Sequence, residues 1–236
     1  MKKMITGVAA VAMMMASAVV GVEVDLTVDV ASAYVFRGMT FNDGVVVQPG
    51  MEVALPFGLS IGVWGNIDID DYDGDLEKNQ FSEIDVYAAY TLPIDLLDIS
   101  IGYTEYTFPG AEGKAEREVG LEFGYDLGVA EVGFGVFYGL DGGVKKDLYL
   151  ELSVGTAYEI IDGLELELGA AVGYLSPDEG DSGFSAYSVT AGLSYGFVGA
   201  SVTYFGQIDK DVLPDVKDGG LYDVEVVGML SLAFSF

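Results

Sequence analysis

Acidic residues recur at every second position in several segments of the chain. Glu23, Asp25 and Asp29 alternate with valine and leucine, and Glu165 and Glu167 alternate with leucine in the same way. In a β-strand, successive side chains point to opposite faces, so each of these rows places its carboxylates on one face. Rows of carboxylates attract cations and repel anions. We therefore expect cation attraction to be the chemistry of this face.

The residue types that are missing exclude several other kinds of chemistry. The 236 residues contain no Cys and no His, which excludes disulfides, thiolate metal sites, His-ligated zinc and Ser-His-Asp catalysis. We therefore predict that the protein is not an enzyme and needs no cofactor. Ten basic residues stand against 38 acidic ones. Nucleic acid is not an expected partner, because phosphates are neutralised by clustered Lys and Arg.

The acidic segment DIDDYDGDLEKNQ suggests calcium, but its spacing does not fit an EF-hand. Aligning Gly74 with the glycine of such a loop puts Ile69 at the first ligand position and Gln80 at the last. Both positions need oxygen ligands, and the last one needs a bidentate carboxylate. We predict no metal site of this type. Loose divalent binding, for example in bridging lipopolysaccharide, stays open.

The alternation extends over most of the chain. It combines a mean hydropathy of +0.39 with a formal net charge of −28, and residues beyond the N-terminus hold no apolar run of the roughly 18 residues needed by a membrane-spanning helix. Strands with one apolar and one polar face explain both values. We predict twelve strands, at residues 22–36, 45–55, 59–69, 82–92, 98–106, 118–126, 129–140, 148–160, 164–174, 185–195, 198–206 and 222–236.

The connections between these strands alternate between long and short. GMTFNDG and QIDKDVLPDVKDGGL are among the long ones, and PFG and IDG among the short ones. An even number of long strands with connections sorted in this way is typical of an outer-membrane barrel. A soluble β-sandwich would not need an apolar face on every strand. We predict an all-β fold: a 12-stranded antiparallel transmembrane β-barrel with short periplasmic turns and longer extracellular loops.

The N-terminus predicts secretion. Lys2 and Lys3 precede an apolar stretch from Met4 to Met15, and Ala16-Ser17-Ala18 follows it. This is the pattern of a cleavable signal peptide, and the apolar stretch is short for an uncleaved helical anchor. We predict a signal peptide at residues 1–18 and a barrel at residues 19–236, located in the outer membrane.

Aromatic residues on the apolar face are expected to form two girdles at the membrane interfaces. With the first strand rising from the periplasm, the outer girdle is predicted to contain Tyr34, Phe36, Tyr138, Tyr174 and Tyr204. The inner girdle is predicted to contain Tyr90, Tyr125, Tyr158 and Tyr195. Lipid and lipopolysaccharide are the expected partners of this face.

The polar face is expected to line the barrel. Its predicted pore-lining residues are Arg37, Glu52, Trp64, Asp68, Glu83, Asp85, Glu122, Glu151, Glu167 and Glu225. An acidic lumen predicts a preference for cations, although a generally acidic composition would give the same pattern. Three further alternatives stay open. Arg37 either constricts the pore or pairs with nearby acids, Trp64 either stacks on a solute or fills space, and the inward glycines either form a groove or mark strand bends.

Several segments resemble the TorF porin family. They are AYVFRGMTFNDGVVVQPGMEV, VWGNID, EIDVYAAY and YTFPG, in the order in which that family has them. The resemblance is strongest over the first half of the chain and implies an outer-membrane porin with no catalytic residues. Resemblance to other outer-membrane proteins also implies that Leu232, Phe234 and Phe236 form a signal for the barrel-assembly machinery.

We thus expect an outer-membrane porin that passes small solutes or cations by passive diffusion. The alternative is a non-conducting structural or adhesive barrel, whose acidic loops contact lipid or surface partners. Homo-oligomerisation stays open.

Overall fold

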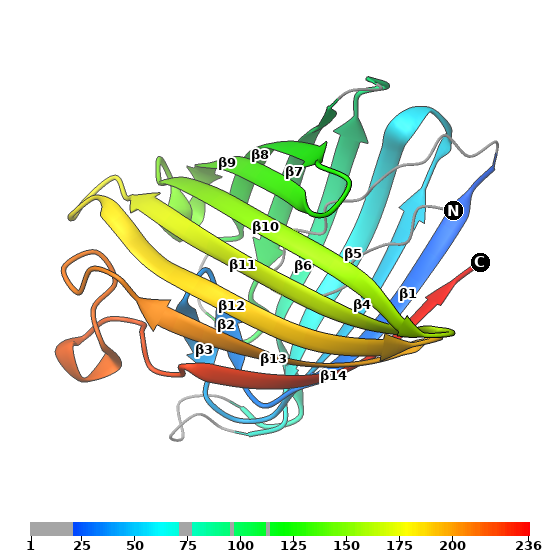
Figure 1. The fold of residues 1–236 in the computed structure, drawn as a ribbon. Coiled ribbons are helices and arrows are strands. Elements are labelled where there is room, and N and C mark those ends of the chain that lie inside the picture. Colours follow the sequence, from blue (N-terminus) through cyan, green and yellow to red (C-terminus); the bar gives the residue numbers. More distant parts are fainter. Residues whose placement is uncertain (1–20, 71–76, 95–96, 112–113) are drawn as a thin grey trace.

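Twelve antiparallel strands form a closed barrel in the computed structural model, which describes residues 21–70, 77–94, 97–111 and 114–236 (Figure 1). The predicted signal peptide at residues 1–18 lies outside the described residues. The barrel strands are β1 (Glu23–Ala31), β4 (Val46–Ala54), β5 (Leu59–Asp68), β6 (Gln80–Thr91), β7 (Asp98–Thr107), β8 (Glu116–Asp126), β9 (Glu131–Asp141), β10 (Leu148–Ile161), β11 (Leu164–Ser176), β12 (Gly183–Tyr195), β13 (Val198–Gln207) and β14 (Val226–Ser235).

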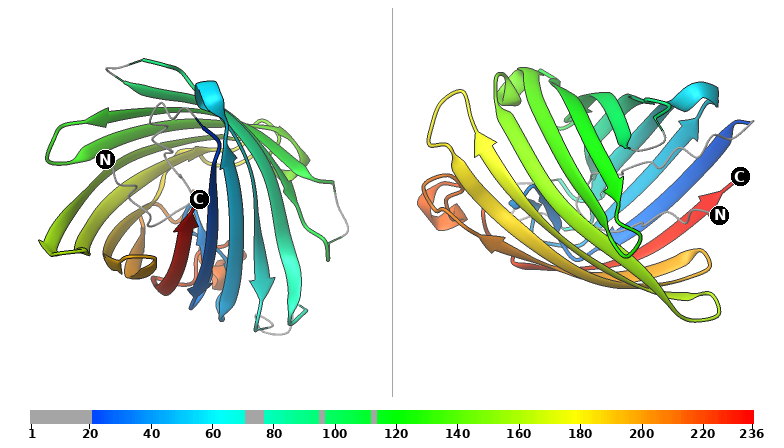
Figure 2. Two further views of the ribbon diagram at one scale, coloured as in Figure 1. Left: turned by 90° about the vertical axis from the view of Figure 1, so that its right-hand side faces the viewer. Right: turned by 45° about the horizontal axis from the view of Figure 1, so that its top comes forward.

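Each strand pairs with its neighbours in sequence, and β14 pairs with β1 to close the sheet. In this closing pair Leu26 lies opposite Phe234, and Val28 lies opposite Leu232. Backbone hydrogen bonds of 3.0 and 3.1 Å between Val24 and Phe236 extend the pairing. The predicted 12-stranded fold is therefore confirmed. Figure 2 shows the strands running obliquely around the barrel.

The alternation seen in the sequence separates the two faces of the wall. On β1, Leu26, Val28 and Val30 point outward and are exposed, whereas Asp25 and Asp29 point inward and are partly buried. The same separation recurs around the sheet. It follows from the two-residue period of a strand once one face is closed off from solvent.

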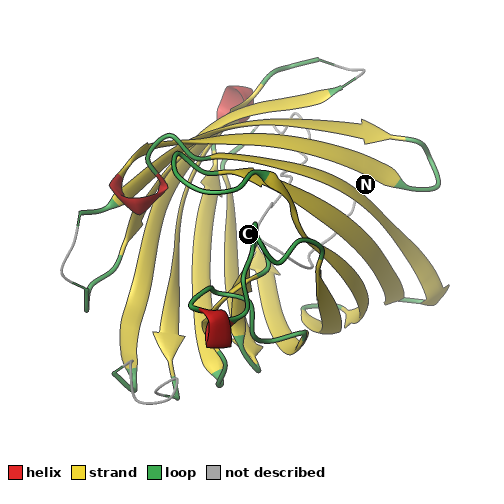
Figure 3. Cartoon of the chain, turned by 90° about the vertical axis from the view of Figure 1, so that its left-hand side faces the viewer, coloured by secondary structure: helices red, strands yellow, loops and turns green. Residues whose placement is uncertain are grey.

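Turns at one end of the barrel are short, and loops at the other end are longer. Residues 162–163 and 196–197 connect neighbouring strands at the first end, whereas residues 208–225 connect β13 to β14 at the second. In the described connections, one-turn 3-10 helices lie at Pro56–Gly58, Gly142–Val144 and Val216–Asp218 (Figure 3). No helix in the described part of the chain is long and apolar enough to cross a membrane.

The first strand is shorter than predicted. The wall strand ends at Ala31, and the chain then forms a separate two-stranded sheet of β2 (Tyr34–Phe36) and β3 (Met39–Asn42) inside the barrel. Arg37 and Gly38 form its tight turn, with φ values of 55° and 83°, as expected for a type I′ hairpin. The prediction of one strand over 22–36 was wrong because the period-two pattern continues into the hairpin. The last strand likewise begins at Val226 rather than at residue 222.

The β2–β3 hairpin is packed on both sides. Tyr34 lies in a cluster with Val46 of β4 and Trp64 of β5. On the other side, Met39 packs against Leu213 in the loop that joins β13 to β14. Backbone and side-chain hydrogen bonds of Thr40 to Leu221 and Val224 tie the hairpin to the same loop. The hairpin is therefore a fixed part of the lumen.

Replacing Gly38 is expected to displace the hairpin. An added Cβ at Gly38 would lie 2.5 Å from the Cβ of Ala186 in β12, so Gly38→Ala adds a clash of about 1–3 kcal/mol to the backbone strain. We expect Trp64, the only Trp of the chain, to lose its contact with Tyr34. Its fluorescence emission should move to longer wavelength in the folded barrel.

Gly128→Ala is the matched control for this substitution. Gly128 has nearly the same φ, +81°, but no atom lies within 4 Å of an added Cβ. The Gly128→Ala variant should have similar backbone strain, but its β2–β3 hairpin should stay in place. Equal emission spectra for the two variants would contradict the proposed docking of the hairpin.

Candidate functional site

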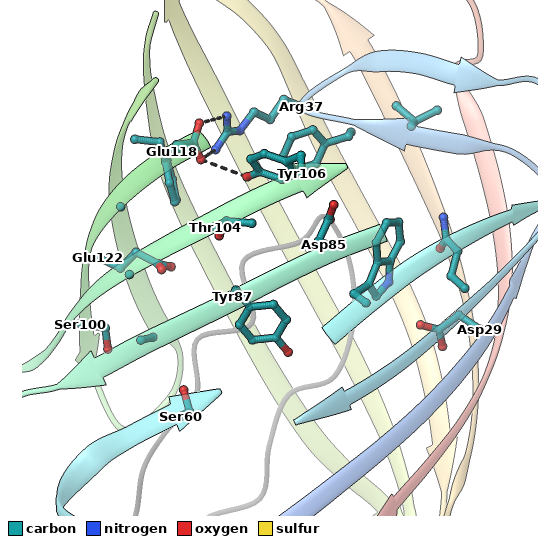
Figure 4. A pocket seen from close by; sticks show the side chains of 18 of the residues that line it. Asp29, Arg37, Ser60, Asp85, Tyr87, Ser100, Thr104, Tyr106, Glu118 and Glu122 are labelled. Atoms are coloured by element: carbon teal, nitrogen blue, oxygen red, sulfur yellow. Dashed lines mark hydrogen bonds and ion pairs between the residues drawn. The ribbon is translucent and has the colours of Figure 1, made fainter. Parts of the chain in front are cut away.

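The lumen contains a cavity of about 390 Å³ beside the β2–β3 hairpin. Carboxylates of Asp29, Asp85 and Glu122 line it, together with hydroxyl groups of Ser60 and Ser100 from neighbouring strands (Figure 4). These side chains come from the inward positions of β1, β5, β6, β7 and β8. The cavity is the candidate site, because it combines enclosed space with charged groups.

Most of the predicted pore-lining residues lie at inward positions of the wall, whereas Arg37 lies in the turn of the β2–β3 hairpin and not on a wall strand. Buried inward carboxylates are those of Glu52, Asp68, Glu83, Asp85, Glu151 and Glu167. Trp64, Asp85, Glu122 and Arg37 line the cavity itself. Glu225 precedes β14 and is exposed. That these residues line a conducting pore stays a prediction.

The predicted aromatic girdles need one correction. Tyr34 and Phe36 are not on the outer face, because they belong to the β2–β3 hairpin and line the cavity. The other predicted girdle residues occupy outward positions, where Tyr90, Tyr125, Tyr138, Tyr158, Tyr195 and Tyr204 are exposed and Tyr174 packs edge-on against Phe184. Their place at the headgroups stays a prediction.

Arg37 extends from the tip of the hairpin to the opposite wall. Its two terminal nitrogens donate hydrogen bonds of 2.7 and 2.8 Å to the carboxylate of Glu118 on β8. The guanidinium also lies over the rings of Phe36, Phe137 and Tyr149, at 4.7, 4.6 and 4.4 Å from their centroids. Bidentate pairing and stacking of this kind hold an arginine firmly. The alternative that Arg37 pairs with an acid is therefore confirmed, and constriction of a pore by Arg37 stays a prediction.

Amide side chains surround Asp68 near the outer end of the wall. Asn42 and Asn66 donate hydrogen bonds of 2.8 and 2.9 Å to one oxygen of Asp68, and Gln48 donates one of 3.0 Å to Asn66. Asn42, Gln48 and Asn66 were not predicted as site residues. Gln48 and Asn66 occupy inward positions of β4 and β5, so the alternating pattern could have identified them.

Other carboxylates in the lumen have fewer partners. Within the described residues, one oxygen each of Glu52, Asp85 and Glu122 is buried and has no hydrogen-bond partner. Buried charge without a partner is costly unless a neighbouring cation or proton compensates it. These three groups are therefore the ones suited to attract a mobile cation.

Inward glycines make room for aromatic rings. Gly62 lies between Glu52 and Tyr87 in the strand register, and a Cβ at Gly62 would lie 2.2 Å from the Tyr87 ring. The ring thus crosses β5 toward Glu52. Tyr149 covers Gly173 in the same way. Rings occupy the space above Gly62 and Gly173, so neither glycine forms an open groove. The register between β11 and β12 shifts at Gly173, which agrees with the alternative of a strand bend there.

Ion pairs outside the wall hold the long loops. Asp215, in the loop joining β13 to β14, contacts Lys217 at 3.0 Å and Lys210 at 3.3 Å. The hydrogen bond from Lys217 lowers the pKa of the Asp215 carboxyl. Lys146 pairs with Asp178 at 2.8 Å, and this contact raises the pKa of Lys146. These lysines are thus engaged in the loops.

Breaking the Arg37–Glu118 pair from one side is expected to destabilise the barrel. Arg37→Met leaves the Glu118 carboxylate, which is 7% exposed, without its counter-charge, and Glu118→Gln does the reverse. Each should lower the free energy of unfolding by about 3 kcal/mol. The double variant should lose clearly less than the sum. Urea unfolding of barrels refolded in detergent micelles measures all three.

Arg117→Met provides the control for this cycle. Arg117 pairs with Glu105 on the outer face at 2.8 Å, and both side chains are more than one third exposed. The Arg117→Met substitution should lower the free energy of unfolding by less than about 1 kcal/mol. Additive losses in the double variant would contradict the coupling of Arg37 and Glu118.

Solved structures of similar fold are outer-membrane porins and channels. The KdgM porin aligns with a TM-score of 0.57 and 9% identity over 91% of this chain and 99% of that one. The NanC porin gives 0.52 and 11% over 89% and 98%, and the COG4313 outer membrane channel from Pseudomonas putida F1 gives 0.52 and 10% over 93% and 97%. At this identity the likeness establishes the fold, which is that of an outer-membrane protein.

Sequence comparison identifies a family. No curated protein matches the chain. A family model does match residues 15–220, which is most of the chain. The protein therefore belongs to the Gcw_chp family, described as bacterial proteins of unknown function.

Proposed function

We propose that the barrel is an outer-membrane channel through which small solutes diffuse passively, with a preference for cations. The observation that carries the proposal is the cavity within the closed sheet, whose wall presents the carboxylates of Asp85 and Glu122, each with one buried oxygen that has no hydrogen-bond partner among the described residues. The porin and channel structures of similar fold support it, as does the resemblance of the first half of the chain to the TorF porin family.

The distribution of charge supports the preference for cations. Inward carboxylates occur on most of the wall strands. Among the described residues, the basic side chain in the lumen is that of Arg37. Glu118 neutralises it. Arg117 also carries a positive charge and lies on β8, but it pairs with Glu105 on the outer face. A negative wall of low dielectric concentrates cations and repels anions.

This charge also argues against a polyanionic solute. The KdgM porin has been solved in complex with an oligogalacturonate, which carries many carboxylates. Here such a solute would meet a wall of the same sign. We therefore propose cations and small neutral molecules as the solutes, rather than acidic saccharides.

One observation favours the alternative of a non-conducting barrel. The β2–β3 hairpin and the loop joining β13 to β14 pack against each other within the lumen, through Met39, Leu213 and Tyr222. In that case the acidic loops would serve lipid or surface partners. Electrical recording distinguishes the two functions.

In a planar bilayer with a KCl gradient, the purified protein should give discrete current steps and a reversal potential of the sign for K⁺. The double variant Asp85→Asn, Glu122→Gln should move the reversal potential clearly toward zero, because it removes two charges that face the cavity. Glu179→Gln, in the exposed loop between β11 and β12, removes a charge outside the lumen and should leave the potential unchanged. Absence of current would favour the non-conducting barrel, and anion preference would contradict the proposed selectivity.

We further propose that Leu232, Phe234 and Phe236 are recognised during barrel assembly. They occupy outward positions at the closing edge of the sheet, where the ring of Phe234 stacks on that of Phe197 at 5.2 Å. The double variant Phe234→Ser, Phe236→Ser should reduce the amount of folded barrel in the outer membrane several-fold. Protease protection in intact cells measures it. Phe57→Ser is the control, since Phe57 is 90% exposed in the β4–β5 turn, and equal yields of both variants would refute the signal.

A further inference from the structure

We infer that the lumen contains a binding site for an alkylammonium group, formed by the Asp85 carboxylate and the surrounding aromatic rings of Trp64, Tyr106 and Tyr34. The inference rests on the proposed function only in so far as a solute must enter the lumen. It specifies a solute class, organic amines, within the broader preference for cations.

The strand register brings the three wall residues together. Trp64 on β5 lies directly opposite Asp85 on β6, and Asp85 lies directly opposite Tyr106 on β7. Directly opposite residues on one face have Cβ atoms about 5 Å apart. Asp85 is therefore flanked on both sides by an aromatic ring, and all three side chains line the cavity. Figure 4 shows Asp85 and Tyr87 on one strand, next to the strand that carries Tyr106.

The hairpin completes the aromatic surround. The ring of Tyr34 on β2 lies 5.6 Å from that of Trp64, and the ring of Phe36 lies 6.4 Å from that of Tyr106. Faces of Trp, Tyr and Phe rings attract weakly hydrated cations within about 6 Å of the ring. The hairpin and the wall thus present rings on several sides of one carboxylate.

The Asp85 carboxylate can accept a further hydrogen bond. It is 8% exposed, and one of its oxygens has no hydrogen-bond partner among the described residues. The Glu83 carboxyl occupies the next inward position of β6, two residues away, and is also buried. Two neighbouring buried carboxylates repel each other, so a cation beside them is stabilised. An ammonium N–H would supply both the missing donor and the counter-charge.

The protein's own arginine does not fill this role. Arg37 is held by Glu118 on β8 and by three rings, whereas Asp85 lies two strands away on β6. The site is also unsuited to a hard metal ion. Such ions need several oxygen ligands, and no metal-binding group of three or more Asp, Glu, His or Cys side chains occurs in the described residues.

Fluorescence of Trp64 offers a direct test in detergent-solubilised barrel, because it is the only Trp of the chain. Butylammonium should change the emission in a saturable way, whereas butanol, which has the same chain without the charge, should not. Asp85→Asn should weaken the apparent affinity for butylammonium by about tenfold. Glu179→Gln removes an exposed carboxylate outside the lumen and should leave the affinity unchanged.

The same probe in the bilayer assay separates this inference from the proposed function. Butylammonium should block K⁺ current in the wild-type channel and block it less in Asp85→Asn. If no current is seen but the fluorescence titration saturates and depends on Asp85, the result supports the binding site and contradicts the channel function. If the channel conducts, but butanol acts like butylammonium or Asp85→Asn responds as the wild type, the binding site is refuted.

Discussion

The pairing of β1 with β14 is the constraint on which the rest of the structure depends. A sheet in a membrane leaves no partner for the backbone groups of an open edge, so it must close on itself. Here closure is made by residues more than 200 positions apart, such as Leu26 and Phe234. Once the sheet is closed, the two-residue period determines which side chains face outward and which face inward. The apolar rows face outward, and the carboxylate rows face one shared interior.

A shared interior creates a problem that the β2–β3 hairpin helps to solve. Carboxylates from many strands converge there, and their mutual repulsion destabilises the closed barrel. Arg37 brings one positive charge across the lumen to Glu118, 81 residues along the chain. Asn42 donates a side-chain hydrogen bond to Asp68. The hairpin therefore neutralises or solvates acids of the wall while it narrows the lumen. Glu52, Asp85 and Glu122 each keep one buried oxygen without a hydrogen-bond partner among the described residues.

Features that depend on residues close together in the sequence could be predicted from it, whereas contacts between distant strands could not. The strands, their faces and the sorting of the loops depend on local alternation, and these were predicted nearly throughout. Tyr34 and Phe36 were misplaced because alternation reports one buried face without saying whether it faces lipid or the lumen. Contacts such as that of Trp64 with Asp85 depend on the register between strands, which composition does not specify. The role of Gly62 depends on the Tyr87 ring, which comes from a neighbouring strand.

The aromatic rings explain how an acidic lumen gains selectivity beyond the sign of charge. Carboxylates alone would attract any cation, including strongly hydrated metal ions. Rings that cover inward glycines, such as Tyr87 over Gly62, make the wall apolar between its charges. A cation that sheds water easily and tolerates an apolar surface is then favoured over one that does not. Where rings and an unsatisfied acid meet, at Asp85, the wall suits an organic ammonium group better than a bare metal ion.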